Sequence, residues 1–190
     1  MPRKYLYLTR PEWAETWVSG GQVPIALAST YRSVERAGTM TPDENLIHDA
    51  PVDIASLRHF GLHFENVKGL TFTGNTFNGQ LLPSFENANY YTEDGLILSF
   101  SNVLSFDICA RLGKAACVEI LDVDALKAAI DDQLGVAGTA KDCTYTADHR
   151  RDHFLKSVHD EWQHEFRIFW PLREGRNVLL SPGMARHVSV

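Results

Sequence analysis

The spacing of hydrophobic residues changes period close to residue 165, and this change separates two predicted elements. Apolar residues recur at three- and four-residue steps over 154–162, which predicts a helix with one apolar stripe. From Glu165 onward apolar and polar residues alternate, which predicts a strand over 165–170 that Pro171 ends. A carboxylate at the start of such a strand can point into a cleft. The plainer alternative is a half-exposed strand on which Glu165 and Arg167 share one face and are solvated or paired with neighbours.

The same two periods predict short elements in mixed order along the rest of the chain. Strands are expected over 5–8, 22–29, 96–101, 116–120, around 145 and over 178–180. Helices are expected after a cap at Thr9, from 41–44, from 51–53, over 104–112, from Asp122 or Asp124 to 134, and in the His- and Arg-rich stretch before 165. Mixed helices and strands, with strands concentrated in the middle and at the C-terminus, indicate an α+β fold.

Residues 62–94 differ in composition from the rest of the chain. Apolar residues there alternate with glycine and asparagine up to residue 79, which predicts a β-hairpin with glycine turns. A polar, aromatic loop with Tyr90 and Tyr91 is expected over 80–94. The chain of 190 residues is therefore read as a single domain over 1–190 with a hairpin and loop insertion around 62–94.

Composition and charge limit the compartments and binding partners that are expected for the protein. A formal net charge of −6 argues against bulk attraction to nucleic acid, although a local basic groove remains compatible with it. The three cysteines have no metal-like spacing, which favours a reducing, cytoplasmic compartment. No apolar run approaches the ~18 residues of a membrane span. The N-terminal residues lack the apolar core of a secretory signal, so no membrane partner is expected.

Four of the eight histidines lie within sixteen residues, and two of them have zinc-like spacing. His149 and His153 are four residues apart, but the string His-Arg-Arg-Asp-His lacks the glutamate base of the zinc-protease motif. A solvated basic helix face that includes Lys156 is the favoured interpretation, and no metal site is predicted. A zinc-dependent hydrolase remains the less favoured alternative.

A third set of residues follows the strands in a defined order. An early strand carries Tyr5 and Tyr7, a strand end carries Thr30-Tyr31-Arg32, a central strand ends in Ser99-Phe100-Ser101, and a late strand opens with Gln163-His164-Glu165. This order resembles the ADP-ribosyltransferase superfamily, toxin-like enzymes that split NAD, in which a late Gln-x-Glu or Glu-x-Glu supplies the catalytic glutamate. The resemblance implies a split mixed or antiparallel sheet with flanking short helices.

A second resemblance covers most of the chain in order. A bacterial family of unknown function has a Leu-Ser-Phe-Ser-like strand, then a glycine, a Val-Glu-Ile-like strand, and a closing Lys, Trp and Glu-x-Arg. The matching residues here are Leu98 to Ser101, Gly113, Val118 to Ile120, Lys156, Trp162, and Glu165 with Arg167.

The resemblance to the ADP-ribosyltransferases implies roles for particular residues. Glu165 is the expected catalytic carboxylate, Gln163 orients the acceptor, and Tyr31 completes the catalytic set. Expected NAD-binding residues are Tyr7, Arg32 for the diphosphate, Ser99 and Ser101 for the ribose, and Tyr91 for stacking. In two respects the chain departs from the family: its first strand has no His or Arg, and its middle motif is Ser-Phe-Ser rather than Ser-Thr-Ser.

The function expected from this resemblance is a cytoplasmic, NAD-dependent mono-ADP-ribosyltransferase, as in bacterial toxins or anti-phage effectors. Its partners would be NAD, a protein or RNA/DNA acceptor, and an antitoxin protein. The basic segment 149–156 and the Tyr90-Tyr91 pair are candidate contacts for a nucleic acid. The alternative from another class is a non-catalytic binding module in which Glu165 and Arg167 form a structural pair.

Overall fold

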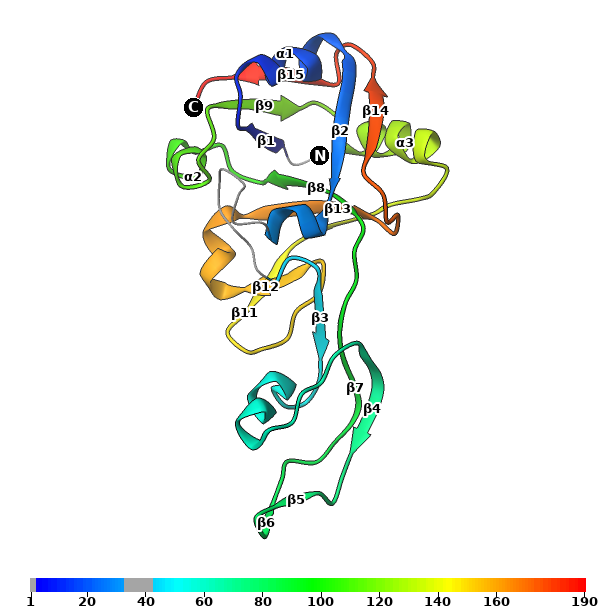
Figure 1. Ribbon diagram of the computed structural model, residues 1–190. Coiled ribbons are helices and arrows are strands. Elements are labelled where there is room, and N and C mark those ends of the chain that lie inside the picture. Colours follow the sequence, from blue (N-terminus) through cyan, green and yellow to red (C-terminus); the bar gives the residue numbers. More distant parts are fainter. Residues whose placement is uncertain (1–2, 33–42) are drawn as a thin grey trace.

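A mostly antiparallel sheet with a few short helices forms the body of the molecule in the computed structural model, which describes residues 3–32 and 43–190. The α+β prediction is therefore confirmed at the level of class. The main sheet has the order β10-β13-β8-β1-β9-β15, and its strands are β1 (Lys4–Leu8), β8 (Leu96–Ser101), β9 (Ala116–Ile120), β10 (Thr139–Asp142), β13 (Glu165–Trp170) and β15 (Ala185–Val188). Figure 1 shows this sheet above a slender projection.

The main sheet is split along one edge of β8. Strand β1 pairs with β8 at Tyr5 and Ser101 alone. Strand β2 (Gly21–Leu27) pairs with the other end of β8, through Ala26–Ile97 and Leu27–Leu96, and continues along β14 (Arg176–Leu180). In the described part of the chain the middle of β8 has no strand partner on this side, so β1 and β2 diverge around a gap.

The helices cover the upper part of the sheet and begin and end at identifiable residues. They are α1 (Glu12–Ser19), α2 (Phe106–Arg111) and α3 (Val123–Leu134). Asp122 caps α3 by accepting from two backbone N–H groups, and Gly135 ends it with φ 68°. Thr9 does not cap α1: Pro11 stands at the N-cap, and the Thr9 hydroxyl instead accepts a hydrogen bond from Lys114.

The core of the body lies between the main sheet and helices α1 and α3, whereas α2 packs in a second, smaller cluster with Tyr5, Tyr7 and Cys117. Leu126 and Ile130 of α3 are fully buried in the main core, together with apolar residues from β1, β2, β8, β13 and β14. Trp170 at the end of β13 has no exposed surface and donates from its indole nitrogen to Asp131 Oδ1 at 2.6 Å. This bond ties β13 to α3, so the strand that begins at Glu165 is anchored at its far end.

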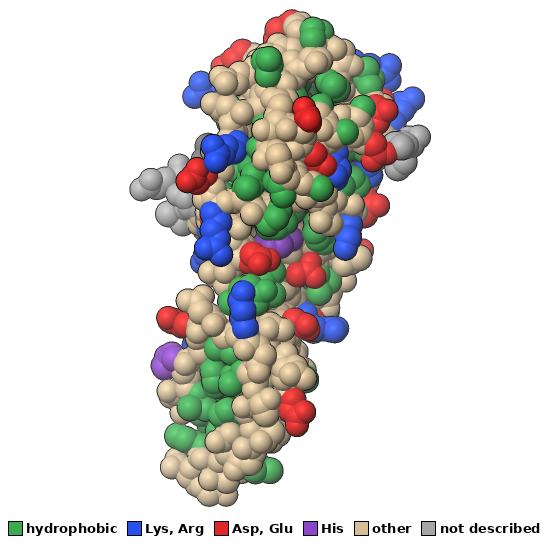
Figure 2. Space-filling model, turned by 90° about the vertical axis from the view of Figure 1, so that its right-hand side faces the viewer, with side chains coloured by type: hydrophobic (Ala, Val, Ile, Leu, Met, Phe, Trp, Pro, Cys, Tyr) green, Lys and Arg blue, Asp and Glu red, His purple; other side chains and the backbone are tan. Residues whose placement is uncertain are grey.

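The projection, called the arm, comprises residues 46–92. Its sheet has the order β3 (Leu46–Asp49), β7 (Phe85–Thr92), β4 (Val67–Phe72). The 3₁₀ helix η2 (Ile54–Phe60) and the small hairpin of β5 (Thr76–Phe77) and β6 (Gln80–Leu81) complete it. The arm has its own apolar cluster, and Figure 2 shows hydrophobic side chains along one of its faces. At the tip, Leu81 is 72% exposed and Phe77 42%.

The arm corrects two expectations from the sequence. A hairpin is present, but it runs over β5 and β6 at 76–81, and β4 pairs with β7 rather than with a strand inside 62–79. Residues 80–94 do not form a loop, because β7 is the central strand of the arm sheet. The inserted unit also begins before residue 62, since β3 and η2 belong to it. Of the predicted helix start at 41–44, residues 41 and 42 lie outside the described residues, and 43 and 44 lie in a turn.

The stretch before Glu165 is not the predicted helix. It contains β11 (Thr144–Thr146), β12 (Leu155–Ser157), which pairs with β11 in parallel, and the 3₁₀ helix η3 (Val158–Gln163). Lys156 is buried there while the flanking Leu155 is only half-buried, which is opposite to what the apolar stripe predicts. The ion pairs of Lys156, described below, explain why a charged residue points inward. Strand β10 has no counterpart among the strands predicted from the sequence.

Strand β13 itself is confirmed, but the half-exposed alternative is wrong. All six of its residues are buried, including Glu165 at 6% exposure and Arg167 at 2%. The reason is that β10 and β8 flank the strand on both edges and the segment that precedes the arm covers Arg167. Among the described residues, no helix is long and apolar enough to cross a membrane.

Candidate active site

The gap between β1 and β2 opens into a cavity of about 450 Å³. The 3₁₀ helix η1 (Ala28–Arg32) and the ends of β8 and β13 border it. Most of its wall is apolar, with contributions from Leu6, Leu8, Trp17, Val23, Pro24 and Ile97. A largely apolar pocket with a few converging polar groups is the usual form of a small-molecule site.

Six of the eight residues predicted from the sequence line this one cavity. They are Tyr7, Tyr31, Ser99, Ser101, Gln163 and Glu165. They come from five different segments of the chain, and the divergence of the two strands from β8 brings them together. The ordered set therefore converges in space, although each of its motifs is short.

Arg32 and Tyr91 do not line the cavity. Arg32 is exposed and its guanidinium donates to Asn45 Oδ1 at 3.2 Å. Tyr91 lies on β7 of the arm, where the ammonium of Lys68 stacks over its ring at 4.1 Å. The structure thus separates the predicted diphosphate and stacking residues from the other six.

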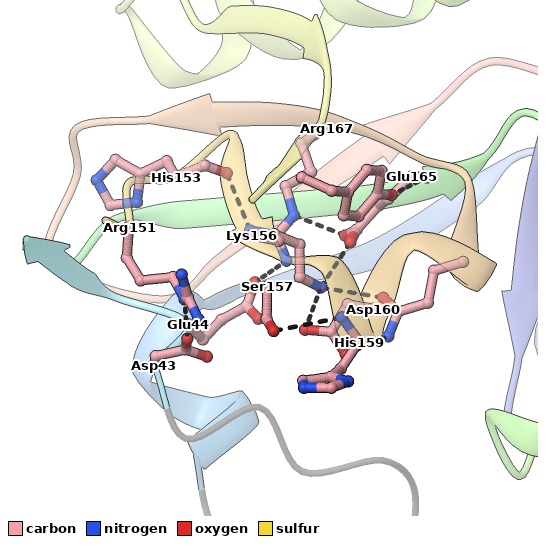
Figure 3. Close-up of polar contacts among 12 residues, drawn as sticks. Asp43, Glu44, Arg151, His153, Lys156, Ser157, His159, Asp160, Glu165 and Arg167 are labelled. Carbon is pink, nitrogen blue, oxygen red and sulfur yellow. Dashed lines mark hydrogen bonds and ion pairs between the residues drawn. The ribbon is translucent and has the colours of Figure 1, made fainter. Parts of the chain in front are cut away.

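The polar end of the cavity is a buried cluster of four charges, called the charge cluster: Glu44, Lys156, Glu165 and Arg167. Arg167 Nε donates to Glu165 Oε1 at 2.6 Å, and Lys156 Nζ donates to Glu165 Oε2 at 2.8 Å. The Arg167 guanidinium is also ion-paired with Glu44, through Nη2. Figure 3 shows both cations directed at Glu165. Two carboxylates and two cations leave the cluster with no formal net charge.

Glu165 is held in its ionised form. Its burial alone raises the pKa, but the charges of Arg167 and Lys156, with their hydrogen bonds, outweigh burial and lower it from 4.5 to about 2. The pKa of Arg167 is raised in turn, because Glu165 and Glu44 outweigh the effect of its burial. The site therefore offers a carboxylate that its two cationic partners keep ionised, and each of its two oxygens has a lone pair left for a further hydrogen bond.

Gln163 is part of the support around Glu165. Its side-chain oxygen accepts from Lys156 Nζ at 3.0 Å, and its nitrogen donates to Asp160 Oδ1 at 3.2 Å. Asp160 also lies 4.0 Å from Lys156 Nζ and is more exposed than the members of the charge cluster. Both ends of the Gln163 amide are thus engaged inside the protein.

The backbone at Glu165 is fixed by its neighbours. The Glu165 N–H donates to the hydroxyl of Tyr145 at 2.9 Å, and the Glu165 carbonyl accepts from the Cys143 N–H at 2.8 Å. His164, immediately before, has φ 46° in the left-handed region, which a non-glycine residue adopts at some cost. This turn separates η3 from β13 and sets the direction in which the Glu165 side chain leaves the strand.

The two serines of β8 differ in their surroundings. The Ser101 hydroxyl is buried, donates to the Gln163 carbonyl at 2.9 Å and accepts from the Val103 N–H at 3.1 Å. The Ser99 hydroxyl is half-buried, lines the cavity, and makes no hydrogen bond in the described part of the chain. Ser101 therefore supports the strand end, whereas Ser99 is available to a ligand.

Tyr7 lines the cavity, and its hydroxyl is engaged with the segment after β8. The hydroxyl donates to the Val103 carbonyl at 2.8 Å and accepts from the Ser105 N–H at 2.8 Å. Burial raises the pKa of this hydroxyl to about 12. Tyr7 thus holds β1 against the segment that follows β8 and shapes the wall of the cavity.

Sequence reasoning did not identify the partners of Glu165. Lys156 and Arg167 stand in the Lys, Trp, Glu-x-Arg pattern, but nothing in that pattern says that they flank the carboxylate. Glu44 gives no sequence signal, because it lies far from β13 in the chain and only the fold brings it to Arg167. A short strand is predicted around Tyr145, but nothing in the sequence indicates that its hydroxyl contacts Glu165.

The clustered histidines do not share a helix face. His149 Nε2 bonds with the Ala50 carbonyl at 2.9 Å, and His153 Nε2 bonds with Glu93 Oε2 at 3.1 Å. The reason is that residues 149–153 form an irregular loop between β11 and β12 where a helix was predicted. Within residues 3–32 and 43–190, no group of three or more His, Cys, Asp or Glu side chains is arranged to hold a metal ion.

Comparisons of the chain with family models, with curated proteins and with solved structures give no match. A function for this chain therefore has to be inferred from its residues and their geometry.

Proposed function

We propose that this chain is an NAD-dependent mono-ADP-ribosyltransferase whose catalytic carboxylate is Glu165. The observation that carries the proposal is a buried glutamate, hydrogen-bonded to two cations, at the polar end of an apolar cavity. The cavity lies where β1 and β2 part from β8, which agrees with the split sheet that the resemblance implies. The Gln-x-Glu motif and the early and middle strand motifs meet at this one place.

The chemistry that this site suits is cleavage of the bond between nicotinamide and ribose. The bonding electrons leave with nicotinamide, which departs as a neutral molecule, and the ribose carbon develops oxocarbenium character. A carboxylate beside the ribose stabilises the developing positive charge and accepts a hydrogen bond from the 2′-hydroxyl. Glu165 suits this role better than that of a general base, because a carboxylate with so low a pKa binds a proton weakly.

The remaining residues have subsidiary roles in this proposal. The Ser99 hydroxyl holds a ribose hydroxyl, and Tyr31 faces the nicotinamide. Gln163 acts through Lys156 rather than directly on an acceptor, since both ends of its amide are engaged. Arg32 and Tyr91 lie outside the cavity, so binding of the NAD diphosphate by Arg32 requires it to leave Asn45.

The acceptor and the biological setting follow from the resemblance. In this proposal the protein is a cytoplasmic bacterial toxin or anti-phage effector that modifies a protein or a nucleic acid, and an antitoxin protein keeps it silent. The net charge of −6 fits a protein acceptor at least as well as RNA or DNA.

The test is transfer of label from NAD to components of a cell lysate by the purified protein. Wild type should transfer label, and Glu165→Gln should not. Glu119→Gln is a matched control, because Glu119 is equally buried and paired with two arginines but lies outside the cavity. Removing a buried ion-pair partner costs about 3–5 kcal/mol, so the melting temperature of each variant is measured alongside. Loss of transfer in both variants, or in neither, contradicts the proposal.

Treatment of the labelled products identifies the class of acceptor. Release of label by protease indicates a protein acceptor, and release by nuclease indicates RNA or DNA.

A non-catalytic binding module is the second candidate, and one observation favours it. Every member of the charge cluster already has a partner inside the protein, which is also how a purely structural ion-pair network looks. A titration with NAD distinguishes the two. The transferase binds NAD and releases nicotinamide, whereas the module does neither.

A further inference from the structure

Glu44 is the member of the charge cluster that lies farthest from β13 in the sequence. It stands in the turn before the arm, is buried to 5% exposure, and is ion-paired with Nη2 of Arg167, whereas Glu165 pairs with Nε. It also lines the cavity. Its neighbour Asp43 is ion-paired with a different cation, Arg151, at 2.6 Å and does not line the cavity.

The charge of Glu44 decides whether the charge cluster around Glu165 is neutral or carries a net positive charge. With Glu44 the two carboxylates balance Lys156 and Arg167. Without it, Lys156 and Arg167 outnumber Glu165 and the cluster carries one positive charge. Asp160 compensates poorly, because it is more exposed and its contact with Lys156 is 4.0 Å long.

We propose that Glu44 is a positioning and charge-balancing residue for the reaction at Glu165, an inference that rests on the proposed function. By neutralising Arg167 it lets the negative charge of Glu165 act on the ribose. By holding Nη2 of the guanidinium it also fixes the direction in which Arg167 presents Nε to Glu165. Glu44 itself does not touch the reacting atoms.

The net charge of the charge cluster affects the transition state more than it affects the bound substrate. Positive charge moves onto the ribose as the bond to nicotinamide breaks, close to the carboxylate of Glu165. One uncompensated buried cation near the reacting atoms opposes that charge enough to slow the reaction by about 10- to 100-fold. The effect therefore falls mainly on kcat, and KM changes less.

The experiment measures kcat and KM for nicotinamide release from NAD in five proteins: wild type, Glu44→Gln, Glu44→Asp, Asp43→Asn and Glu165→Gln. Glu44→Gln keeps the shape but removes the charge, and Glu44→Asp restores the charge on a shorter side chain. Asp43→Asn is the matched control, because it removes an ion pair from the same turn without touching Arg167. The melting temperature of each protein is recorded so that unfolding is not mistaken for lost activity.

The expected result is a lower kcat in Glu44→Gln, substantial recovery in Glu44→Asp, and wild-type kinetics in Asp43→Asn. If Glu44→Gln stays within about 2-fold of wild type while Glu165→Gln is inactive, the inference is wrong and the proposed function stands. Equal loss in Asp43→Asn, or no recovery in Glu44→Asp, also overturns the inference. A wild type that neither binds nor cleaves NAD overturns both.

Discussion

At the scale of single residues, the difference between the two serines of β8 gives a direct test of how the cavity is used. Ser99→Ala removes a hydroxyl that lines the cavity and has no hydrogen-bond partner among the described residues. The free energy of unfolding of the protein should therefore change by less than about 0.5 kcal/mol. Binding of NAD should weaken by about 10-fold, because a hydrogen bond to the ligand is lost.

Replacing Ser101 by alanine should instead destabilise the fold and leave NAD binding nearly unchanged. It leaves the Val103 N–H without its acceptor near the strand end, so unfolding free energy should fall by about 1–3 kcal/mol. Chemical denaturation and an NAD titration on both variants give the comparison. If Ser99→Ala destabilises the fold and leaves NAD binding unchanged, the assignment of Ser99 to the ligand is wrong.

The sequence predicts the residues that touch the cavity better than those that support them. The motif around Glu165 could be identified because a Gln-x-Glu pair opens a strand that alternation makes visible. Glu44 and Tyr145 could not be identified, since their role arises only from contacts between distant segments. Arg167 was seen, but its complete burial was not, because alternation does not distinguish a solvated charge from a paired one.

At the scale of elements, most strands of the main sheet were predicted, whereas β10, β15 and the segment before Glu165 were not. Strands β8, β9 and β13 carry uninterrupted or alternating apolar patterns that fit their buried positions. In the segment 154–163 the helical spacing of apolar residues was coincidental. The ion pairs of Lys156 and the parallel pairing of β12 with β11 hold 155–157 extended instead, and 158–163 form a 3₁₀ helix.

Gly138, just before β10, gives a prediction at this scale. A Cβ atom at this position would lie 2.5 Å from the indole nitrogen of Trp170 and closer than 3.0 Å to two further indole atoms. Gly138→Ala should therefore lower the free energy of unfolding by about 1–3 kcal/mol, because a fully buried ring has little space to move. Gly135→Ala is not a suitable control, since its φ of 68° is itself unfavourable for alanine. A Gly138→Ala protein as stable as wild type would show that Trp170 is packed more loosely than described.

At the scale of the whole molecule, the arm meets the body at a junction that contains three histidines. His48 of β3 exchanges backbone hydrogen bonds with Arg151, and its ring lies 4.7 Å from the ring of His149. His153 stacks on Phe169 and bonds with Glu93, which follows β7. The arm has its own apolar cluster, so these contacts rather than a shared core set its attachment.

Two of these histidines make the junction sensitive to pH. Burial lowers the pKa of both His48 and His153 below 6.5, with His149 adding to the effect on His48 and Arg167 to that on His153. Asp53 and Asp148 near His48, and Glu93 and Asp152 near His153, oppose the effect without reversing it. The histidines bind protons more weakly when folded, so they favour the closed junction above pH 6.5 and disfavour it as the pH falls below 6.5.

The expected outcome is faster amide hydrogen exchange in β3 and β7 at pH 5.5 than at pH 7.5, after correction for the intrinsic rates. The strands of the main sheet should change less. Replacing His48 and His153 by leucine should remove the pH dependence. Exchange in the arm that is the same at both pH values would contradict this account of the junction.

The central claim is that Glu165 acts chemically on NAD, and release of nicotinamide by the purified protein tests it most directly. The informative variant is Glu165→Asp, which keeps the charge of the cluster but withdraws the carboxylate from the ribose. Wild type should release nicotinamide, Glu165→Asp should be slower by about 100-fold with a similar melting temperature, and Glu119→Gln should match wild type. Nicotinamide release that is unchanged in Glu165→Asp, or absent in a wild type that does not bind NAD, would contradict the claim.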